Sequence, residues 1–231
     1  MLECARSRLM NTVAQTQRES GATRRPRRGR RASVLVVLAF LIADAAFGSI
    51  GSGQAGPERL PGTWCGGQLW RMMTLSDPDR RRVEFDDESA TIASLAKLSP
   101  PARISASRSS DFQRRVWRLR TVVDRYRVAS NGEIVLILYS IDSAQYMNAY
   151  MPNPDCLSAA TRYRAGLVAA RRAFVGACPR PTPSWQLLGA TVDMAGVGFW
   201  NPVKSTRGAL PNGAELRPVT AFKLVAGCGT G

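Results

Sequence analysis

"VWRLRTVVDRYRV", residues 116–128, is the stretch of sequence that decides the fold. Apolar and polar residues alternate along it, as in a strand with one face in a core, and the alternation changes phase at Thr121-Val122. One extra residue in a strand produces such a change, so we expect a long strand with a β-bulge. The inward-facing residues would be Trp117, Leu119, Val122, Tyr126 and Val128, and the outward-facing ones Arg118, Arg120, Arg125 and Arg127.

Two further strands are predicted directly after this one. Asn131-Gly132 is a strong hairpin signal, and residues 133–139 (EIVLILY) form a nearly continuous apolar run, typical of a strand covered on both faces. Residues 145–151 (QYMNAYM) alternate again. One side of this third strand would carry Met147, Ala149 and Met151, and the other Tyr146, Asn148 and Tyr150.

A helix is predicted between the third strand and the last two. Pro152 and Pro154 end the third strand, and the helix would stop near Cys178-Pro179. Between these points the apolar residues recur at spacings of three and four, which predicts one stripe of a helix: Leu157, Ala160, Tyr163, Leu167, Ala170 and Phe174. Residues 185–200 and 214–226 supply two more strands, with glycines where a strand must bend.

The order of these elements predicts the fold class. A mainly β chain of order β-β-β-α-β-β, with a long bulged first strand, matches an OB-fold-like five-stranded barrel, here in residues 111–231. Pro211-Asn212-Gly213 would end the long loop before the last strand, because Asn-Gly readily adopts the positive φ required there. Pro218 cannot donate a ladder hydrogen bond, so it should lie at an edge or a bulge.

The N-terminal 45 residues are predicted to be a targeting segment. "RRPRRGRR" is dense in arginine, and the apolar run that follows it at residues 33–43 is too short to span a bilayer comfortably. Ala43-Asp44-Ala45 resembles a cleavage site, so we expect a signal peptide in residues 1–45, or alternatively an N-terminal membrane anchor formed by residues 33–50. The mature protein would be extracellular or held in the cell envelope.

Residues 46–110 are predicted to be an irregular arm that packs on the barrel. "DESATIASLAKLSPP" favours one short helix, capped by Asp87 or Ser89, with the acids at 86–88 favouring a helix N-terminus rather than a catalytic carboxylate pair. The arm also carries three large apolar residues. We expect these to cover the apolar outer face of the second strand (Trp64, Trp70 and Met72 over Val135, Ile137 and Tyr139).

The cysteines of an exported chain point to disulfides. Residues 46–231 contain four cysteines, and an even number predicts two bridges, for which three pairings are possible. We favour Cys156–Cys178, which would bracket the helix, and Cys65–Cys228, which would join the ends of the domain. The chain has no histidine and no CxxC pair, so neither a metal site nor a cofactor is expected.

One segment resembles a known family. "AGVGFWNPVKSTRGALPNGAELRPV" is similar to the C-terminal motif GVGFFDxxHGQxGxAPNGIELHPV of exported bacterial proteins of uncharacterised function, and "CGGQLWRMMTLSD", "NGEIVLIL" and "MPNPDC" resemble its other motifs. The resemblance implies an exported, disulfide-bonded, OB-like protein and no established activity. Where the family has Lys, His, Asp, His and His, this chain has Met73, Val135, Asn201, Lys204 and Arg217. Either a polar site has been lost or structural residues have drifted.

The sequence argues against an enzyme. It lacks the histidine of Ser-His and Cys-His chemistry, and it contains no GxSxG, P-loop or GxGxxG motif. Without residues 1–45 the chain has 23 basic and 14 acidic residues, a net charge of +9, and a binding role fits better. The candidate surface is the outer face of the first three strands, which would take an anionic polymer or an envelope protein: Arg118, Arg120, Arg125, Arg127, Tyr146 and Tyr150. The alternatives are a plain solvated strand face and a degenerate copy of an enzymatic or metal-binding family.

Overall fold

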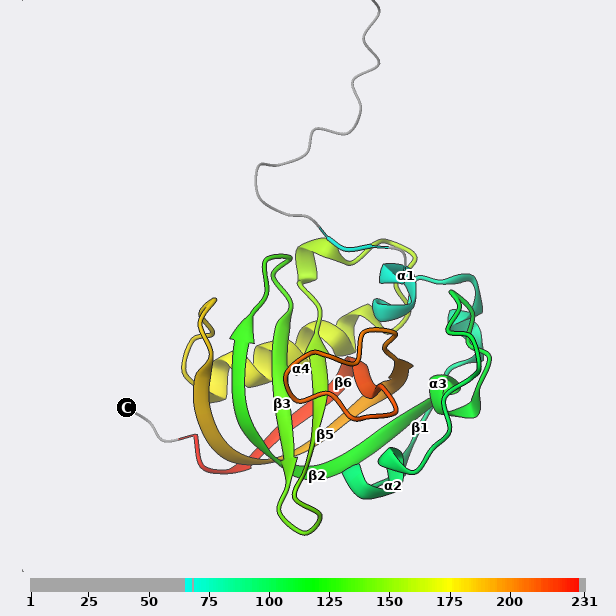
Figure 1. The fold of residues 1–231 in the computed structure, drawn as a ribbon. Helices are drawn as coiled ribbons and strands as arrows, with labels where there is room; N and C mark the ends of the chain where they lie inside the picture. The colour runs from blue at the N-terminus through cyan, green and yellow to red at the C-terminus, as the bar shows by residue number, and fades with distance from the viewer. Residues whose placement is uncertain (1–64, 68, 229–231) are drawn as a thin grey trace, which may run out of the picture. The chain divides into compact units, whose positions relative to one another are not determined.

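Six strands form a single sheet in the computed structural model, which describes residues 65–67 and 69–228 (Figure 1). The predicted mainly β class is confirmed. The strands are β1 (Glu84–Ser89), β2 (Arg115–Val128), β3 (Ile134–Ser140), β4 (Gln145–Met151), β5 (Gln186–Trp200) and β6 (Ala214–Ala226). The helices are α1 (Trp70–Met73), α2 (Ile92–Ala96), α3 (Asp111–Arg114) and α4 (Arg164–Ala177), with 3-10 turns η1 (Pro78–Arg82) and η2 (Pro154–Cys156).

The strand pairings of β2 to β6 return to the strand from which they start. β2 pairs antiparallel with both β3 and β5, β3 pairs with β4, and β5 pairs with β6. A parallel contact between β4 and β6, at Ala149 and Leu216, completes the cycle. β1 is the additional strand, and it lies parallel to the first part of β2. The predicted order of three strands, one long helix and two strands is therefore present.

The bulge in β2 lies closer to its C-terminus than predicted. The register shifts between Val123 and Arg125 rather than at Thr121-Val122. Leu119 and Tyr126 are buried as expected, but the inward valine is Val123, whereas Val122 and Val128 are only half-buried. The prediction failed here because a bulge can be placed at either of two neighbouring apolar residues, and only cross-strand packing selects one of them.

The end of the β5–β6 loop, residues 201–213, agrees with its turn residues. Gly213 has a φ of 79°, the left-handed conformation expected of Asn-Gly. The side chain of Asn212 accepts a hydrogen bond from the amide of Ala214 and donates to the carbonyl oxygens that end α2, those of Leu95, Ala96 and Leu98. Pro218 lies in β6 where the pairing with β5 is irregular, as a proline within a strand requires.

The main core lies between the sheet and two helices. The ring of Phe174, on α4, meets those of Tyr126 and Phe222 edge-on, each at 5.3 Å between centroids. Ile92 and Leu95 bring α2 into the same core. Figure 1 shows α4 running behind the strands. Burial of large apolar side chains such as these stabilises a fold by about 1.5–3 kcal/mol each.

α4 is shorter than the predicted apolar stripe. The helix begins at Arg164, so Leu157, Ala160 and Tyr163 precede it. The preceding segment is held by the arm instead: the amide of Arg162 donates to the carbonyl oxygen of Leu75, and the Arg162 guanidinium donates to three arm carbonyls, those of Arg80, Arg81 and Val83. Long-range hydrogen bonds therefore replace the first predicted turns of the helix.

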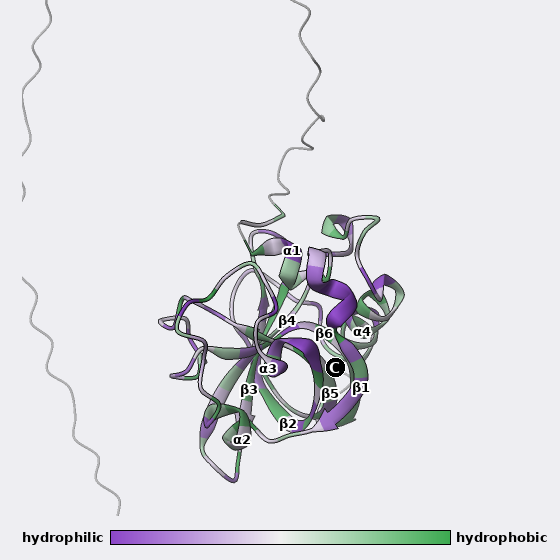
Figure 2. Ribbon diagram, turned by 90° about the vertical axis from the view of Figure 1, so that its right-hand side faces the viewer, coloured by the Kyte–Doolittle hydropathy of each residue, from purple (hydrophilic) through white to green (hydrophobic). Residues whose placement is uncertain are grey.

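The arm is more regular than predicted, and it covers a different face. The acids at 86–88 lie in β1, which is largely hydrophilic in Figure 2, and not at a helix N-terminus. α2 is capped by Thr91, whose side chain accepts from the amide of Ser94, rather than by Asp87 or Ser89. The arm contributes Leu75 and Val83 to a second apolar cluster formed with α4, β2, β5 and the segment before α4: Val116, Leu157, Leu167, Ala195 and Val197. Of the three residues predicted to cover β3, Trp70 and Met72 lie in α1, and Trp64 lies outside the described residues.

A buried ion pair connects two parts of the arm that are distant in sequence. Arg108 and Asp77 are both about 1% exposed or less, and the Arg108 Nη2 lies 2.8 Å from the Asp77 Oδ1. The same guanidinium also donates to the carbonyl oxygens of Met72 and Gln113. Because its hydrogen bonds are satisfied, the pair avoids the large cost of an unpaired buried charge.

Two disulfides are present, with a different pairing from the one favoured above. Cys65 bonds Cys156, and Cys178 bonds Cys228. The favoured pairing is wrong because α4 separates Cys156 from Cys178, whereas the arm places Cys65 beside η2 and the end of β6 brings Cys228 to the end of α4. Two disulfides are typical of proteins in an oxidising, exported environment.

The predicted leader lies outside the described residues, and so does Trp64. Within residues 65–67 and 69–228, no helix is long and apolar enough to cross a membrane.

Candidate functional site

The outer face of β3 and β4 brings together four of the six predicted binding residues. Cross-strand register aligns Arg127, Val135 and Tyr150 in one row. The next row holds Arg125, Ile137 and Asn148. Tyr139 and Tyr146 form a third pair, with ring centroids 4.8 Å apart. The β-bulge after Val123 places Arg125 and Arg127 beside this face.

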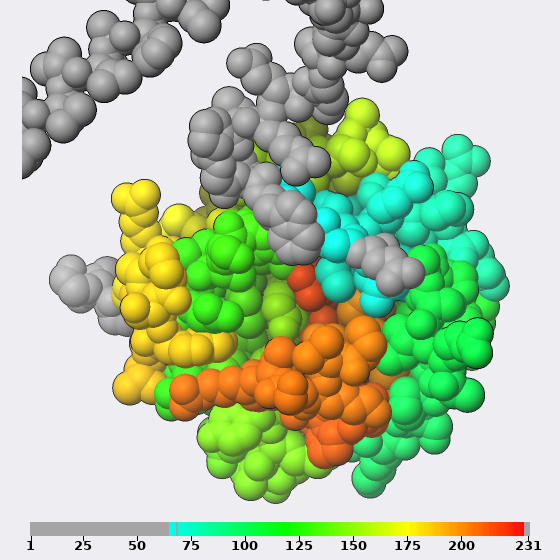
Figure 3. Space-filling view, turned by 45° about the horizontal axis from the view of Figure 1, so that its top comes forward, coloured from blue at the N-terminus to red at the C-terminus, as the bar shows by residue number. Residues whose placement is uncertain are grey.

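A pocket of about 430 Å³ lies over the first of these rows. Its walls come from the β2–β3 loop (residues 129–133) and the β5–β6 loop, which lies across the strands as the orange segment in Figure 3. Trp185, directly before β5, closes another side. The charged side chains that line the pocket are those of Arg127, Glu133, Arg207 and Arg217, and its side-chain amides are those of Asn131 and Asn148.

One arginine at the base of the pocket is shared by two buried carboxylates. The Arg217 guanidinium bonds Glu133 through Nε, at 3.2 Å, and through Nη2. Its Nη1 lies 3.6 Å from the Glu215 Oε1. Asn131 and Asn201 each donate to one of the acids, to Glu133 and Glu215 respectively. The Arg217 guanidinium also covers the ring of Tyr150, 4.1 Å from its centroid. We call Glu133, Arg217 and Glu215 the buried triad.

Burial shifts the titration of the groups in this region. It raises the pKa of Glu215 to about 7, although Arg217 and the hydrogen bond from Asn201 lower it. Burial also raises the pKa of Tyr150 well above its usual range. Burial disfavours the charged form of Arg217, but the carboxylates of Glu133 and Glu215 outweigh it and raise the pKa of Arg217. The buried triad therefore holds a charged arginine and one acid that titrates near neutrality.

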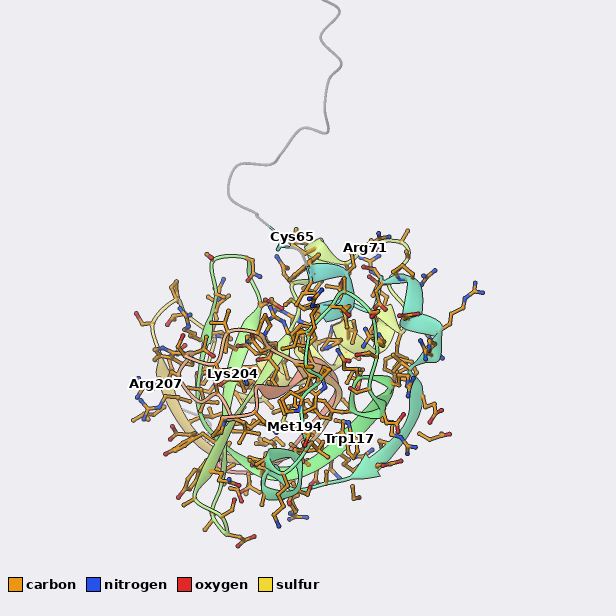
Figure 4. All side chains as sticks on the ribbon, turned by 45° about the vertical axis from the view of Figure 1, so that its right-hand side comes forward. Cys65, Arg71, Trp117, Met194, Lys204 and Arg207 are labelled. Carbon is orange, nitrogen blue, oxygen red and sulfur yellow. A yellow bond between two sulfur atoms is a disulfide. The ribbon has the colours of Figure 1, made fainter. Side chains whose placement is uncertain are left out.

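Two other guanidinium groups at the pocket have no acidic partner among the described residues. Arg127 lies 5.0 Å above the ring centroid of Trp185, and its buried Nε has no hydrogen-bond acceptor within the described part of the chain. Arg207 is exposed, and Figure 4 shows it at the outside of the molecule. Neither enters an ion pair in residues 65–67 and 69–228. They are positioned to receive an anion.

Asn148 presents a buried acceptor beside these donors. The residue is 1% exposed, and its Nδ2 donates to the Thr206 hydroxyl across 3.4 Å. Its Oδ1 has no donor within the described ranges. The approach of the β5–β6 loop requires glycine at 208, because a Cβ there would lie 2.6 Å from the Asn148 Oδ1, and Gly208 also has a φ of 78°.

The predicted arginine stripe is divided by the fold. Arg118 pairs with Asp87 of β1 and Arg120 is exposed near α2, so neither lines the pocket. Arg125 pairs with its neighbour Asp124. Tyr146 is exposed, at 44%, whereas Tyr150 is buried beneath Arg217 and offers little free ring surface. Thus Arg125, Arg127, Tyr146 and Tyr150 share a face, and Arg118 and Arg120 do not.

Several lining residues carried no signal in the sequence. Trp185 opens the predicted strand at residues 185–200 and Arg207 lies in the loop after it, but only the fold brings them to β3 and β4. Asn148 was placed on the correct face, together with both tyrosines, by the alternation of residues 145–151. Glu133 opens the second predicted strand, and its burial could be inferred only from the proximity of Arg217.

The positions at which the chain departs from the family motif lie partly together. Val135 and Arg217 both line the pocket, and Asn201 reaches it indirectly through Glu215. Met73, in α1, and Lys204, in the β5–β6 loop, do not line it. No group of three or more His, Cys, Asp or Glu side chains within the described residues is arranged to hold a metal ion.

The chain matches no family model, no curated protein and no solved structure.

Proposed function

We propose that β2 to β6 form an OB-like five-stranded barrel with a ligand pocket in the usual position for that fold. The support for the barrel is the closed cycle of pairings, with the parallel contact between β4 and β6 and the long helix between β4 and β5. In OB-folds the second and third strands bind oligomeric ligands together with the loops after the first and fourth strands. Here these elements are β3, β4, the β2–β3 loop and the β5–β6 loop.

We propose that the protein is a non-enzymatic, exported module that binds an anionic polymer in this pocket. The observation that carries the proposal is the position of the 430 Å³ pocket between those two loops, with Arg127 and Arg207 free of acidic partners in the described residues. A guanidinium group presents donors in a planar fork that matches carboxylate, sulfate or phosphate. The buried triad contributes a rigid base rather than a reactive group.

The proposed location is outside the cytoplasm, in the extracellular space or the cell envelope. The two disulfides support export, because such bonds form and persist in oxidising compartments. The signal peptide or anchor proposed for residues 1–45 or 33–50 completes this assignment. Processing of the leader can be followed by N-terminal sequencing of the secreted protein.

Retention on immobilised heparin tests the binding site. We expect the double variant Arg127→Gln/Arg207→Gln to elute at clearly lower salt than the wild type and to bind heparin about tenfold or more weakly, because hydrogen bonds to charged groups contribute roughly 1.5–3 kcal/mol. The matched control is Arg118→Gln/Arg120→Gln, which removes the same charge away from the pocket. Equal losses in the two double variants would contradict a localised site, and a wild type without retention would contradict the function.

A second function is favoured by the position of the family departures. We propose, as the alternative, that the pocket is the remnant of a polar or metal-binding site, because Val135, Arg217 and Asn201 cluster there. The triple variant Val135→His/Asn201→Asp/Arg217→His would then bind Zn²⁺, since His and carboxylate side chains are its usual ligands. Calorimetric titration with ZnCl₂ measures this. A variant that unfolds cooperatively but binds no Zn²⁺ would argue against the alternative.

A further inference from the structure

A second, smaller pocket lies on the same strand face as the first. It has a volume of about 210 Å³ and is lined by Asp124, Arg125, Ile137, Tyr146, Arg207 and Gly208. Arg207 lines both pockets. The β5–β6 loop crosses between them, where Gly208 approaches both Ile137 and Asn148.

The two pockets follow one direction along β4. Tyr150 lies at the first and Tyr146 at the second, with Asn148 between them on the same face. Four residues of extended strand span about 13 Å, which exceeds the size of a single small ring. One ligand unit therefore cannot occupy both pockets, whereas an oligomer can pass from one to the other beside Arg207.

The donors and acceptors of the face describe the chemistry of that oligomer. The guanidinium groups of Arg127 and Arg207 favour anionic acceptors, and the buried Asn148 Oδ1 lacks a donor within the described residues. Neither a carboxylate nor a sulfate donates a hydrogen bond, so the ligand must also carry hydroxyl or amide hydrogens. Acidic sugars carry both kinds of group on every unit.

The aromatic residues favour a sugar over single-stranded nucleic acid. Recognition of unpaired bases needs open ring faces for stacking. One face of Trp185 is covered by Arg127, and one face of Tyr150 is covered by Arg217. Tyr146 is the exposed ring on this face, and it is already inclined against Tyr139. One exposed ring can contact the apolar side of one sugar unit, but it cannot stack with a series of bases.

We infer that the site binds an acidic oligosaccharide across two subsites, the second formed by Arg125, Tyr146 and the shared Arg207. This inference rests on the proposed function and specifies its ligand. The first subsite holds one acidic unit by Arg127 and Arg207, with a hydroxyl donating to Asn148. The second subsite adds contact only for a chain long enough to reach Tyr146, so affinity depends on oligomer length.

Calorimetry with heparin-derived di-, tetra- and hexasaccharides at physiological ionic strength tests the inference. We expect the affinity of the wild type to rise about tenfold or more from di- to tetrasaccharide, because the second contact is intramolecular. Tyr146→Ala should abolish that rise without altering the charge. Tyr146→Phe, which keeps the ring, should restore it. The wild type should bind thymidine oligonucleotides of matched charge more weakly.

The outcomes separate this inference from the proposed function. If heparin is retained through Arg127 and Arg207 but the rise with length is absent, or persists in Tyr146→Ala, the second subsite is refuted and the function stands. If thymidine oligonucleotides bind as tightly as the tetrasaccharide, the saccharide assignment is refuted. If no oligosaccharide binds and heparin is not retained, the proposed function itself fails.

Discussion

Glu215 is an acidic residue in a buried environment, which disfavours its charged form. It is 2% exposed, and burial raises its pKa to about 7 from an ordinary value of 4.5. One arginine serves both Glu215 and Glu133, so the folded protein cannot compensate two full negative charges as water does. The buried triad therefore makes the fold sensitive to the protonation of one side chain.

The pH dependence of stability tests this reading of Glu215. Because its pKa is higher in the folded state, its stabilising contribution is complete below pH 4.5 and is lost as the pH rises through 7. A pKa difference of this size corresponds to about 3 kcal/mol. We expect Glu215→Gln to unfold at a higher temperature than the wild type at pH 8 and at a similar one at pH 5. Glu84→Gln, at an exposed position, should follow the wild type. Parallel curves for Glu215→Gln and the wild type would refute the assignment.

At the scale of elements, alternation and turn residues were enough to place all five strands of the second half of the chain. They predicted β4 and β6 with their observed bounds, and β3 and β5 within a residue at each end. The start of α4, the position of the bulge and β1 were not predictable, because each is decided by contacts across long sequence distances. Arg162, for example, gives its amide to Leu75. Half of the candidate site followed from strand register, whereas Trp185 and Arg207 follow only from the folded loops.

Asn212 connects the β5–β6 loop to the end of α2, and the contribution of its side-chain hydrogen bonds to stability can be tested. The donation to the carbonyl oxygens of Leu95, Ala96 and Leu98 satisfies groups that the end of a helix leaves unpaired. We expect Asn212→Ala to lower the free energy of unfolding by about 1–3 kcal/mol and to speed amide hydrogen exchange in residues 201–213. Asn212→Asp keeps the acceptor for the Ala214 amide but cannot donate. If Asn212→Asp matched the wild type, the contacts with α2 would contribute nothing.

For the whole molecule, the disulfides connect parts that are distant in sequence. Cys65–Cys156 closes 91 residues and Cys178–Cys228 closes 50. Each long loop restricts the unfolded chain, which stabilises the folded state by about 2–4 kcal/mol per bridge. The correct pairing could not be chosen from the sequence, because connectivity depends on where the arm and the end of β6 lie.

Peptide mapping without reduction checks this connectivity. We expect the peptide that contains Cys65 to remain joined to that of Cys156, and the peptide of Cys178 to that of Cys228. Cys178→Ser/Cys228→Ser should lower the unfolding temperature while leaving Cys65–Cys156 intact, because the two bridges share no residue. A peptide linking Cys156 to Cys178 would overturn the arrangement.

The hydrogen bonds from Asn212 to the end of α2 anchor the β5–β6 loop to a segment that precedes every strand of the pocket. The Asn212 side chain accepts a hydrogen bond from the first residue of β6 and donates hydrogen bonds to the N-terminal arm. A chain beginning at Asp111 would keep every strand of the pocket. It would lose the hydrogen bonds that hold the β5–β6 loop, which forms one wall of the pocket. The shape of the pocket therefore depends on both segments, and a substitution at the end of α2 can change it.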